Sequence, residues 1–135
     1  MRTKMKGAQM SGKIMHQLLR IRDRAVWSWA GFSHVVRTEH SIVQWLVANA
    51  FFAVLAFLLP LDWGVRGMLL MGGIMVLAAE CVNTAVERVV DDISLETRDL
   101  ARQAKDCGSA AVAVTAIAVG VAWLCVIIGL FVQTA

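Results

Sequence analysis

Three acids and an amide recur at helical spacing near the middle of the chain. Glu80, Asn83, Glu87 and Asp91 fall within the stretch AAECVNTAVERVVDD. Because each residue of an α-helix advances by about 100°, spacings of three and four place all four side chains on one stripe. Carboxylates gathered on one face can bind a cation or take a proton from a substrate. The stripe therefore predicts a catalytic or cation-binding site.

This acidic stripe lies at the end of an apolar run, in a chain whose hydrophobic fraction is 59%. Soluble domains usually have about 45–50%. An unpaired charged carboxylate inside a membrane span costs on the order of a few kcal/mol or more, so such a group usually has a function. Glu80 lies inside the run and Asp91 at its edge, while Glu39 stands just before another apolar run. We interpret these acids as one site graded in depth.

Three apolar runs must position this site. They cover residues 42–59, 65–90 and 108–132, and each approaches the ~20 residues that a bilayer requires of a helix. A short turn at 60–64 and a polar loop at 91–106 connect them. The sequence thus predicts an all-α membrane protein with three transmembrane helices, forming a single domain over residues 1–135.

The chain before the first span is basic. Residues 1–12 are expected to form a flexible tail. Residues 13–37 have the apolar spacing of an amphipathic helix that lies on an anionic membrane surface. Gly7–Lys13 matches seven positions of a P-loop, but Ile14 stands where that motif needs Ser or Thr, so we do not interpret it as one. The apolar residues at helical spacing are Ile14, Leu18, Ile21, Ala25, Trp29, Phe32 and Val36.

Charge and small residues suggest orientation and assembly. Eight of the 13 Lys and Arg residues precede residue 40, and four more lie in or beside the 91–106 loop. The positive-inside rule places the N-terminus and this loop in the cytoplasm. Small residues alternate at spacings of four and three along the last span, which suits close helix packing, either in a homo-oligomer or within one subunit. They are Ala104, Gly108, Ala111, Thr115, Ala118, Ala122, Cys125 and Gly129.

Two other roles fit the acids less well. Glu80 could pair with Arg88 or Lys105 and serve only the assembly of a membrane complex. Acids in spans also mark ion pathways, but here they lie toward the cytoplasmic side, with only Asp62 near the opposite one. A path across the membrane would need polar residues there as well. A site for chemistry is therefore the favoured interpretation.

The chain resembles the small prokaryotic diacylglycerol kinase family of membrane enzymes. The resemblance rests on ECVNTAVERVVD at 80–91 and AKDCGSAAV at 104–112, with weaker matches at 28–31, 37–39 and Trp123. It implies a homotrimer of three-span subunits with a surface helix, in a bacterial inner (cytoplasmic) membrane. It also implies transfer of the γ-phosphoryl group of ATP to diacylglycerol, giving phosphatidic acid for phospholipid recycling. Mg²⁺ is the implied cofactor, ATP and the lipid are the implied partners, and no nucleic acid takes part.

The same resemblance implies a role for each matched residue. Glu80 would be the general base on the lipid hydroxyl, oriented by Asn83, and Glu39 and Glu87 would bind the metal ion. Asp91 is a further member of the polar stripe. The residues implied to contact ATP are Arg20, Trp27, Glu39, Glu87, Glu96, Arg98, Lys105 and Asp106. The residues implied to contact the lipid are Trp29, Glu80, Ser109 and Trp123.

Three short segments bear on which lipid is used. Residues 41–45 (SIVQW) stand where the diacylglycerol branch of the family has an arginine and a second acid. Residues 38–39 (TE) are similar to the related undecaprenol kinase branch. Residues 108–111 (GSAA) are instead similar to the diacylglycerol branch. We therefore expect diacylglycerol as the substrate, with undecaprenol as the alternative.

Overall fold

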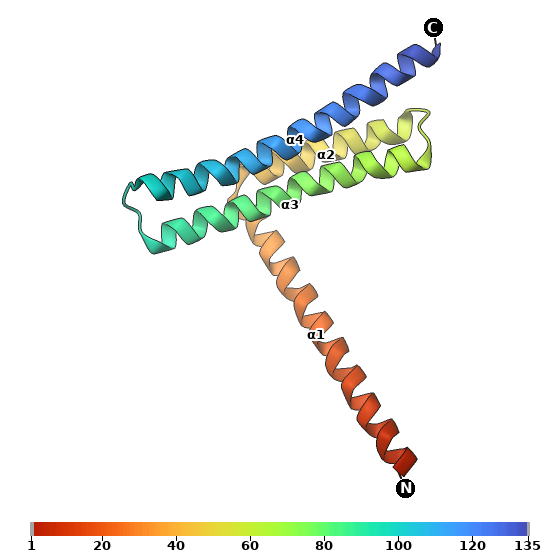
Figure 1. Cartoon of the computed structure of the whole chain (residues 1–135), viewed down its shortest axis with the longest axis vertical. Coiled ribbons are helices and arrows are strands. Elements are labelled where there is room, and N and C mark those ends of the chain that lie inside the picture. The colour runs from red at the N-terminus through yellow and green to blue at the C-terminus, as the bar shows by residue number, and fades with distance from the viewer. Residues whose placement is uncertain (1, 135) are drawn as a thin grey trace. The chain divides into compact units, whose positions relative to one another are not determined.

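The chain is almost entirely helical. The computed structural model describes residues 2–134, with side chains from Lys13 to Val132, and no strand occurs in that range. Four helices follow one another (Figure 1), and they fall into two compact units, Met1–Arg37 and Thr38–Ala135. The predicted all-α fold is confirmed. The helices are α1 (Arg2–Thr38), α2 (His40–Leu58), α3 (Trp63–Ile93) and α4 (Asp99–Thr134).

Most of α1 makes up the first unit. Its helix begins at Arg2, so the structure differs from the flexible tail predicted over residues 1–12, of which Met1 lies outside the described residues. Met, Lys, Ala and Gln make up most of this stretch, and all of them favour helix. The predicted helix over 13–37 is present, and apolar side chains such as Ile14 and Leu18 are exposed on it. Its attachment to a membrane surface stays a prediction.

The helices α2, α3 and α4 are each long and apolar enough to cross a bilayer, which confirms the three predicted spans. The bounds of the helices differ from those of the apolar runs: α3 and α4 extend beyond their runs at both ends, and α2 begins and ends slightly earlier than its run. The predicted polar loop of 91–106 is wrong in length, because α3 continues to Ile93 and α4 already begins at Asp99. Arg, Gln, Ala and Lys are good helix formers and continue the helices outside the apolar runs. The loop therefore consists of residues 94–98 only.

In the second unit α3 is the central helix. Its backbone packs against both α2 and α4 (Figure 1). Gly73 permits the approach to α2, since a Cβ there would overlap Asn49. The helices α2 and α4 meet through side chains instead: the rings of Phe52 and Trp123 lie 5.1 Å apart between centroids. Trp123 also packs on Ala56 in the buried core. A groove can therefore open between α2 and α4.

The lengths of the helices can be compared with the thickness of a bilayer. α2 has 19 residues, which is about 28 Å and close to the ~30 Å of a hydrocarbon core. α3 has 31 residues and so measures about 46 Å. An ion pair joins Glu39, just before α2, to Arg88 on α3, so Arg88 lies level with the start of α2. Glu80 precedes Arg88 by just over two turns and lies about 12 Å deeper in the bundle. Asp91 lies beyond that level, on the side of the loop.

The opposite end of the bundle is closed by a short turn between α2 and α3. Asp62 caps α3 by accepting hydrogen bonds from the backbone nitrogens of Gly64 (2.8 Å) and Val65 (3.0 Å). Arg66 donates from Nε to the Ala56 carbonyl at 2.9 Å. Its guanidinium also lies 4.6 Å from the ring centroid of Trp63. Both charged side chains of this turn therefore have partners within the chain.

Candidate active site

Three of the four acids that were expected at the site line one cavity of about 360 Å³. α3 contributes Glu80 and Glu87, and Glu39 is the residue immediately before α2. Helical spacing aims the two α3 acids to the same side, and the packing of α3 on α2 and α4 supplies the other walls. We call this space the acidic cavity. Its lining residues are Glu39, Ser41, Trp45, Glu80, Asn83, Thr84, Glu87, Ser109, Val112 and Ala113.

Glu80 is the deepest acid of the cavity and is only 4% exposed. Within the described residues its carboxyl group makes no hydrogen bond and no ion pair. The pairing partners weighed from the sequence bind elsewhere: Arg88 pairs with Glu39, and Lys105 pairs with Asp91. A buried polar group is normally hydrogen-bonded, and leaving one unpaired costs stability. Glu80 is therefore available to a ligand and contributes no ion pair to the fold.

Asn83 links the deep and shallow parts of the cavity. Its Nδ2 donates to Glu87 Oε1 at 2.9 Å, while its Oδ1 is buried without a hydrogen-bond partner. The role implied by resemblance, orienting Glu80, is not seen as a hydrogen bond between these two side chains. Gly108 on α4 lies against the amide, since a Cβ at that position would collide with Asn83 Oδ1. The close approach of α4 to this amide therefore depends on the absence of a side chain at 108, and the amide oxygen is enclosed by that packing.

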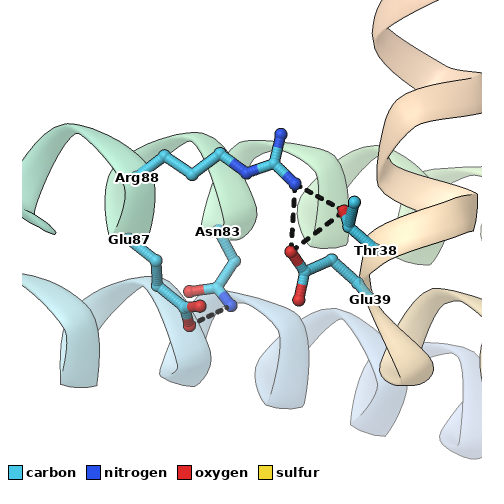
Figure 2. A network of polar contacts seen from close by, with 5 residues as sticks. All are labelled: Thr38, Glu39, Asn83, Glu87 and Arg88. Carbon is cyan, nitrogen blue, oxygen red and sulfur yellow. Dashed lines mark hydrogen bonds and ion pairs between the residues drawn. The ribbon is translucent and has the colours of Figure 1, made fainter. Parts of the chain in front are cut away.

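Glu39 is held from the opposite side by a second set of contacts. Figure 2 shows Arg88 reaching from α3 to Thr38 and Glu39, while Asn83 and Glu87 pair separately. Arg88 Nη2 lies 2.6 Å from Thr38 Oγ1 and 3.1 Å from Glu39 Oε1. Thr38 Oγ1 also donates to Glu39 Oε1, at 3.3 Å. These bonds fix one oxygen of the Glu39 carboxylate.

The donor set suits a metal ion that is shared with a ligand. In the described part of the chain, no three His, Cys, Asp or Glu side chains cluster as a complete metal site. Glu39 and Glu87 each use Oε1 in a hydrogen bond within the protein, which leaves Oε2 of each carboxylate unbonded there. Mg²⁺ is commonly held by one or two carboxylates together with substrate phosphates and water. The two glutamates therefore fit Mg²⁺ brought in with a nucleotide.

A second cavity, of about 240 Å³, lies at the loop between α3 and α4. We call it the loop cavity. It brings together four residues implied to contact ATP, namely Glu96, Arg98, Lys105 and Asp106. Asp91 also lines it, although its helical angle had placed it with the acidic stripe. Lys105 Nζ bonds Asp91 Oδ1 at 2.6 Å, which draws this carboxylate toward α4.

An apolar groove of about 380 Å³ runs along the membrane part of the bundle. Trp123, implied to contact the lipid, lines it together with Phe52 and Leu69. Trp45 lines both this groove and the acidic cavity. Asn49 is a polar residue of the groove, and its Nδ2 is bonded to the Trp45 carbonyl at 2.9 Å. The groove therefore offers an apolar chain a place beside the buried carboxyl group.

The remaining predicted contacts lie on α1. Arg20, Trp27 and Trp29 all have exposed side chains. Trp27 and Trp29 are 69% and 72% exposed, as is suitable for aromatic rings at a membrane interface. All three belong to the first unit of the chain.

The structure adds site residues that sequence reasoning missed. Trp45 joins two cavities, Thr84 is 3% exposed in the acidic cavity, and Arg88 holds Glu39. Thr84 was given no role from the sequence, although it falls on the same helical face as Glu80. Arg88 was weighed from the sequence only as a partner of Glu80, and not of Glu39. Trp45 carried no such signal, because its position depends on how α2 packs against α3 and α4.

The cavity is lined by three acids and lies among three helices that are apolar enough to span a membrane. This combination places the chain in the class of multi-span membrane proteins that have a polar site among their spans. The family follows from sequence comparison. A sequence model of the prokaryotic diacylglycerol kinase family matches residues 26–127. The chain therefore belongs to the prokaryotic diacylglycerol kinase family. It is an enzyme, a kinase of lipid metabolism.

Individual relatives agree with this assignment. The diacylglycerol kinase of Pseudomonas aeruginosa PAO1 is 35% identical over 112 residues, which cover 83% of this chain and 91% of the relative. The diacylglycerol kinase of Escherichia coli K12 is 36% identical over 104 residues, covering 77% and 85%. The similarity thus extends over most of both chains. The family predicted by resemblance is confirmed, and the ion-pathway and assembly-subunit alternatives are set aside.

Proposed function

We propose that the protein transfers the γ-phosphoryl group of ATP to the free hydroxyl of diacylglycerol, giving phosphatidic acid and ADP. The observation that carries this proposal is Glu80, a buried residue whose carboxyl group has no partner among the residues the structure describes, placed where the acidic cavity approaches the apolar groove. A proton acceptor at that depth suits a hydroxyl carried by a lipid. The relatives' function as diacylglycerol kinases supports the choice of lipid.

The proposed reaction uses Glu80 as a carboxylate. It accepts the proton of the lipid hydroxyl as the hydroxyl oxygen forms a bond to the γ-phosphorus. The bond between that phosphorus and the β,γ-bridging oxygen breaks, and its electron pair leaves with ADP. Phosphoryl transfer depends mainly on positioning and on stabilisation of charge. Asn83 contributes positioning, because it holds Glu87 through a hydrogen bond from its Nδ2.

Glu39 and Glu87 would hold Mg²⁺ through their unbonded carboxylate oxygens, with phosphate oxygens completing the coordination. The ion would neutralise negative charge on the phosphates when bound. The loop cavity is the proposed nucleotide contact region, with Glu96, Arg98, Lys105 and Asp106. Arg20 and Trp27, on α1, are proposed as ATP contacts from the family resemblance alone. The proposed lipid contacts are Trp29, Ser109 and Trp123. Asp91 supports the region by holding Lys105.

The proposed setting is the inner membrane of a bacterium. Residues 1–135 act as one domain, with the N-terminus and the loop at 94–98 in the cytoplasm, where ATP is available. Basic residues concentrated on that side support this orientation. A homotrimer is proposed because large apolar side chains of α4, including Phe131 and Val132, are exposed in one chain. A membrane-mimetic preparation should therefore contain an oligomer.

The activity is tested with purified protein in detergent micelles supplied with MgATP and diacylglycerol. We expect radiolabelled phosphatidic acid to form, and its formation to stop when EDTA removes Mg²⁺. Undecaprenol, presented in the same micelles, is the comparison substrate. Faster phosphorylation of undecaprenol would replace the proposed lipid, while failure to phosphorylate either lipid would contradict the kinase function.

A further inference from the structure

We infer that Arg88 is a nucleotide-binding residue that contacts the phosphates of ATP from a position fixed by Thr38 and Glu39. The inference rests on the proposed function and adds to it a residue that neither the sequence pattern nor the family resemblance assigned to the nucleotide. It concerns the contacts that hold Glu39, one of the acids that line the acidic cavity.

The contacts of Arg88 leave most of its donors unused. Nη2 carries both of its bonds, to Thr38 Oγ1 and to Glu39 Oε1. Within the described residues, Nε and Nη1 have no partner, so three N–H groups remain for a ligand. The side chain is 40% exposed, so these groups can be reached from outside the bundle. An arginine tethered on one nitrogen presents the others in a fixed plane, a geometry that suits phosphate oxygens.

The charge of the acidic cavity supports this role. Glu39, Glu80 and Glu87 all line it, and a bound triphosphate would add further negative charge. Among the described residues, Arg88 is the cation that bonds an acid of this cavity, since Lys105 bonds Asp91 and Arg102 bonds Asp106 at the loop cavity. Positive groups aimed at transferring phosphates stabilise the charge that develops on them. Arg88 is placed to supply such a group beside the implied metal ligand Glu39.

A purely structural explanation predicts different behaviour. A half-exposed ion pair between Arg88 and Glu39 would contribute little to folding. Because Arg88 also holds Glu39, an implied metal ligand, its loss would then change only the Mg²⁺-dependent part of nucleotide affinity and leave the affinity without Mg²⁺ unchanged. If Arg88 binds phosphate, its removal weakens nucleotide binding while lipid binding and folding are retained. The two explanations therefore separate on the affinity for an ATP analogue measured without Mg²⁺.

The experiment compares the wild type with Arg88→Gln, Arg88→Lys and Arg22→Gln. Arg22 is the matched control, because it is an exposed arginine of α1 whose described ion pair is with the adjacent Asp23. KM for MgATP and KM for diacylglycerol are measured in micelles. The dissociation constant of a non-hydrolysable β,γ-imido ATP analogue is measured separately by calorimetry, with and without Mg²⁺.

We expect Arg88→Gln to raise KM for MgATP and the dissociation constant of the analogue by about ten- to a hundredfold, as for loss of a charged hydrogen bond. KM for diacylglycerol and both values for Arg22→Gln should stay near the wild type. Arg88→Lys keeps the charge but loses the planar fork, so it should give a smaller increase. Thr38→Val removes the hydrogen bond between Thr38 and Arg88 but keeps the guanidinium and its bond to Glu39. It should likewise give a smaller increase than Arg88→Gln.

Unchanged affinity of Arg88→Gln for the analogue in the absence of Mg²⁺ would overturn the inference. If that variant does not fold, wild-type affinity in Arg88→Lys would overturn it equally. A wild-type protein that binds the analogue but phosphorylates no lipid would instead contradict the proposed function. Because the calorimetric measurement requires no turnover, it still decides the role of Arg88 in that case.

Discussion

The two ends of the helical bundle treat their charged side chains in opposite ways. At the turn between α2 and α3, Asp62 accepts two backbone hydrogen bonds, and Arg66 donates to Ala56 and stacks on Trp63. At the other end, Glu80 is buried without a partner among the described residues. Asn83 Oδ1 is buried and unpaired as well. One end satisfies its polar groups within the chain, and the other has two groups without a partner in the described part of the chain.

This difference separates groups that stabilise the fold from groups kept for a ligand. A satisfied polar group at a helix end contributes stability, whereas a buried unsatisfied one costs stability unless something binds to it. The turn therefore has the features of a structural closure. The acidic cavity contains unsatisfied polar groups that lower stability, as is expected of a binding or catalytic site. Substitutions at the two ends should accordingly affect different measurements.

The largest effect is expected for Glu80→Gln. Glutamine has nearly the same shape but cannot accept the hydroxyl proton, so turnover should fall by about a hundred- to ten-thousandfold. The unfolding transition should not be lowered, because the Glu80 carboxyl makes no ion pair in the described chain. Turnover with MgATP and diacylglycerol is the measurement, alongside binding of the ATP analogue, which should be retained.

The matched control for Glu80→Gln is Asp92→Asn. Asp92 is an exposed acid of the same helix and lies outside both cavities. Its substitution should leave turnover near the wild type. Near-normal turnover in Glu80→Gln would show that the buried carboxyl group is not the proton acceptor. The contrast between the two ends of the bundle would then lose its functional meaning.

A smaller effect on both activity and stability is expected for Gly108→Ala. The added methyl group would collide with Asn83 Oδ1, and overpacking of this kind typically costs about 1–3 kcal/mol. Displacement of Asn83 would also weaken its bond to Glu87 and so lower kcat/KM. Unfolding in mixed micelles and steady-state kinetics measure the two effects.

Gly129→Ala serves as the comparison for Gly108→Ala. Gly129 lies on the same helix, and nothing is within 4 Å of a Cβ placed there. This substitution should be neutral or slightly stabilising, since alanine favours helix. If Gly108→Ala behaved in the same way, the close packing of α4 on the site amide would not be needed for function.

Much of this arrangement could be predicted from the sequence. The three spans follow from apolar runs of bilayer length, and the common face of Glu80, Asn83 and Glu87 follows from helical spacing. Asp91 shows the limit of such reasoning, since its angle matched the stripe but a bond to Lys105 from α4 placed it in the loop cavity. The position of Arg88 depends in the same way on where α2 begins beside α3. Periodicity gives the face of one helix, while contacts between helices depend on packing.

The smallest effect is expected at the structural end, for Asp62→Ala. Loss of an N-cap hydrogen-bond acceptor usually costs about 1 kcal/mol, so the free energy of unfolding should fall by that amount. Because Asp62 lies at the far end of the bundle from Glu80, kcat and both KM values should be unchanged. Asp62→Asn retains an oxygen acceptor and should restore most of the stability. A loss of kcat/KM in Asp62→Ala without loss of stability would contradict the separation of the two ends, because a group satisfied within the chain would then be acting on the reaction.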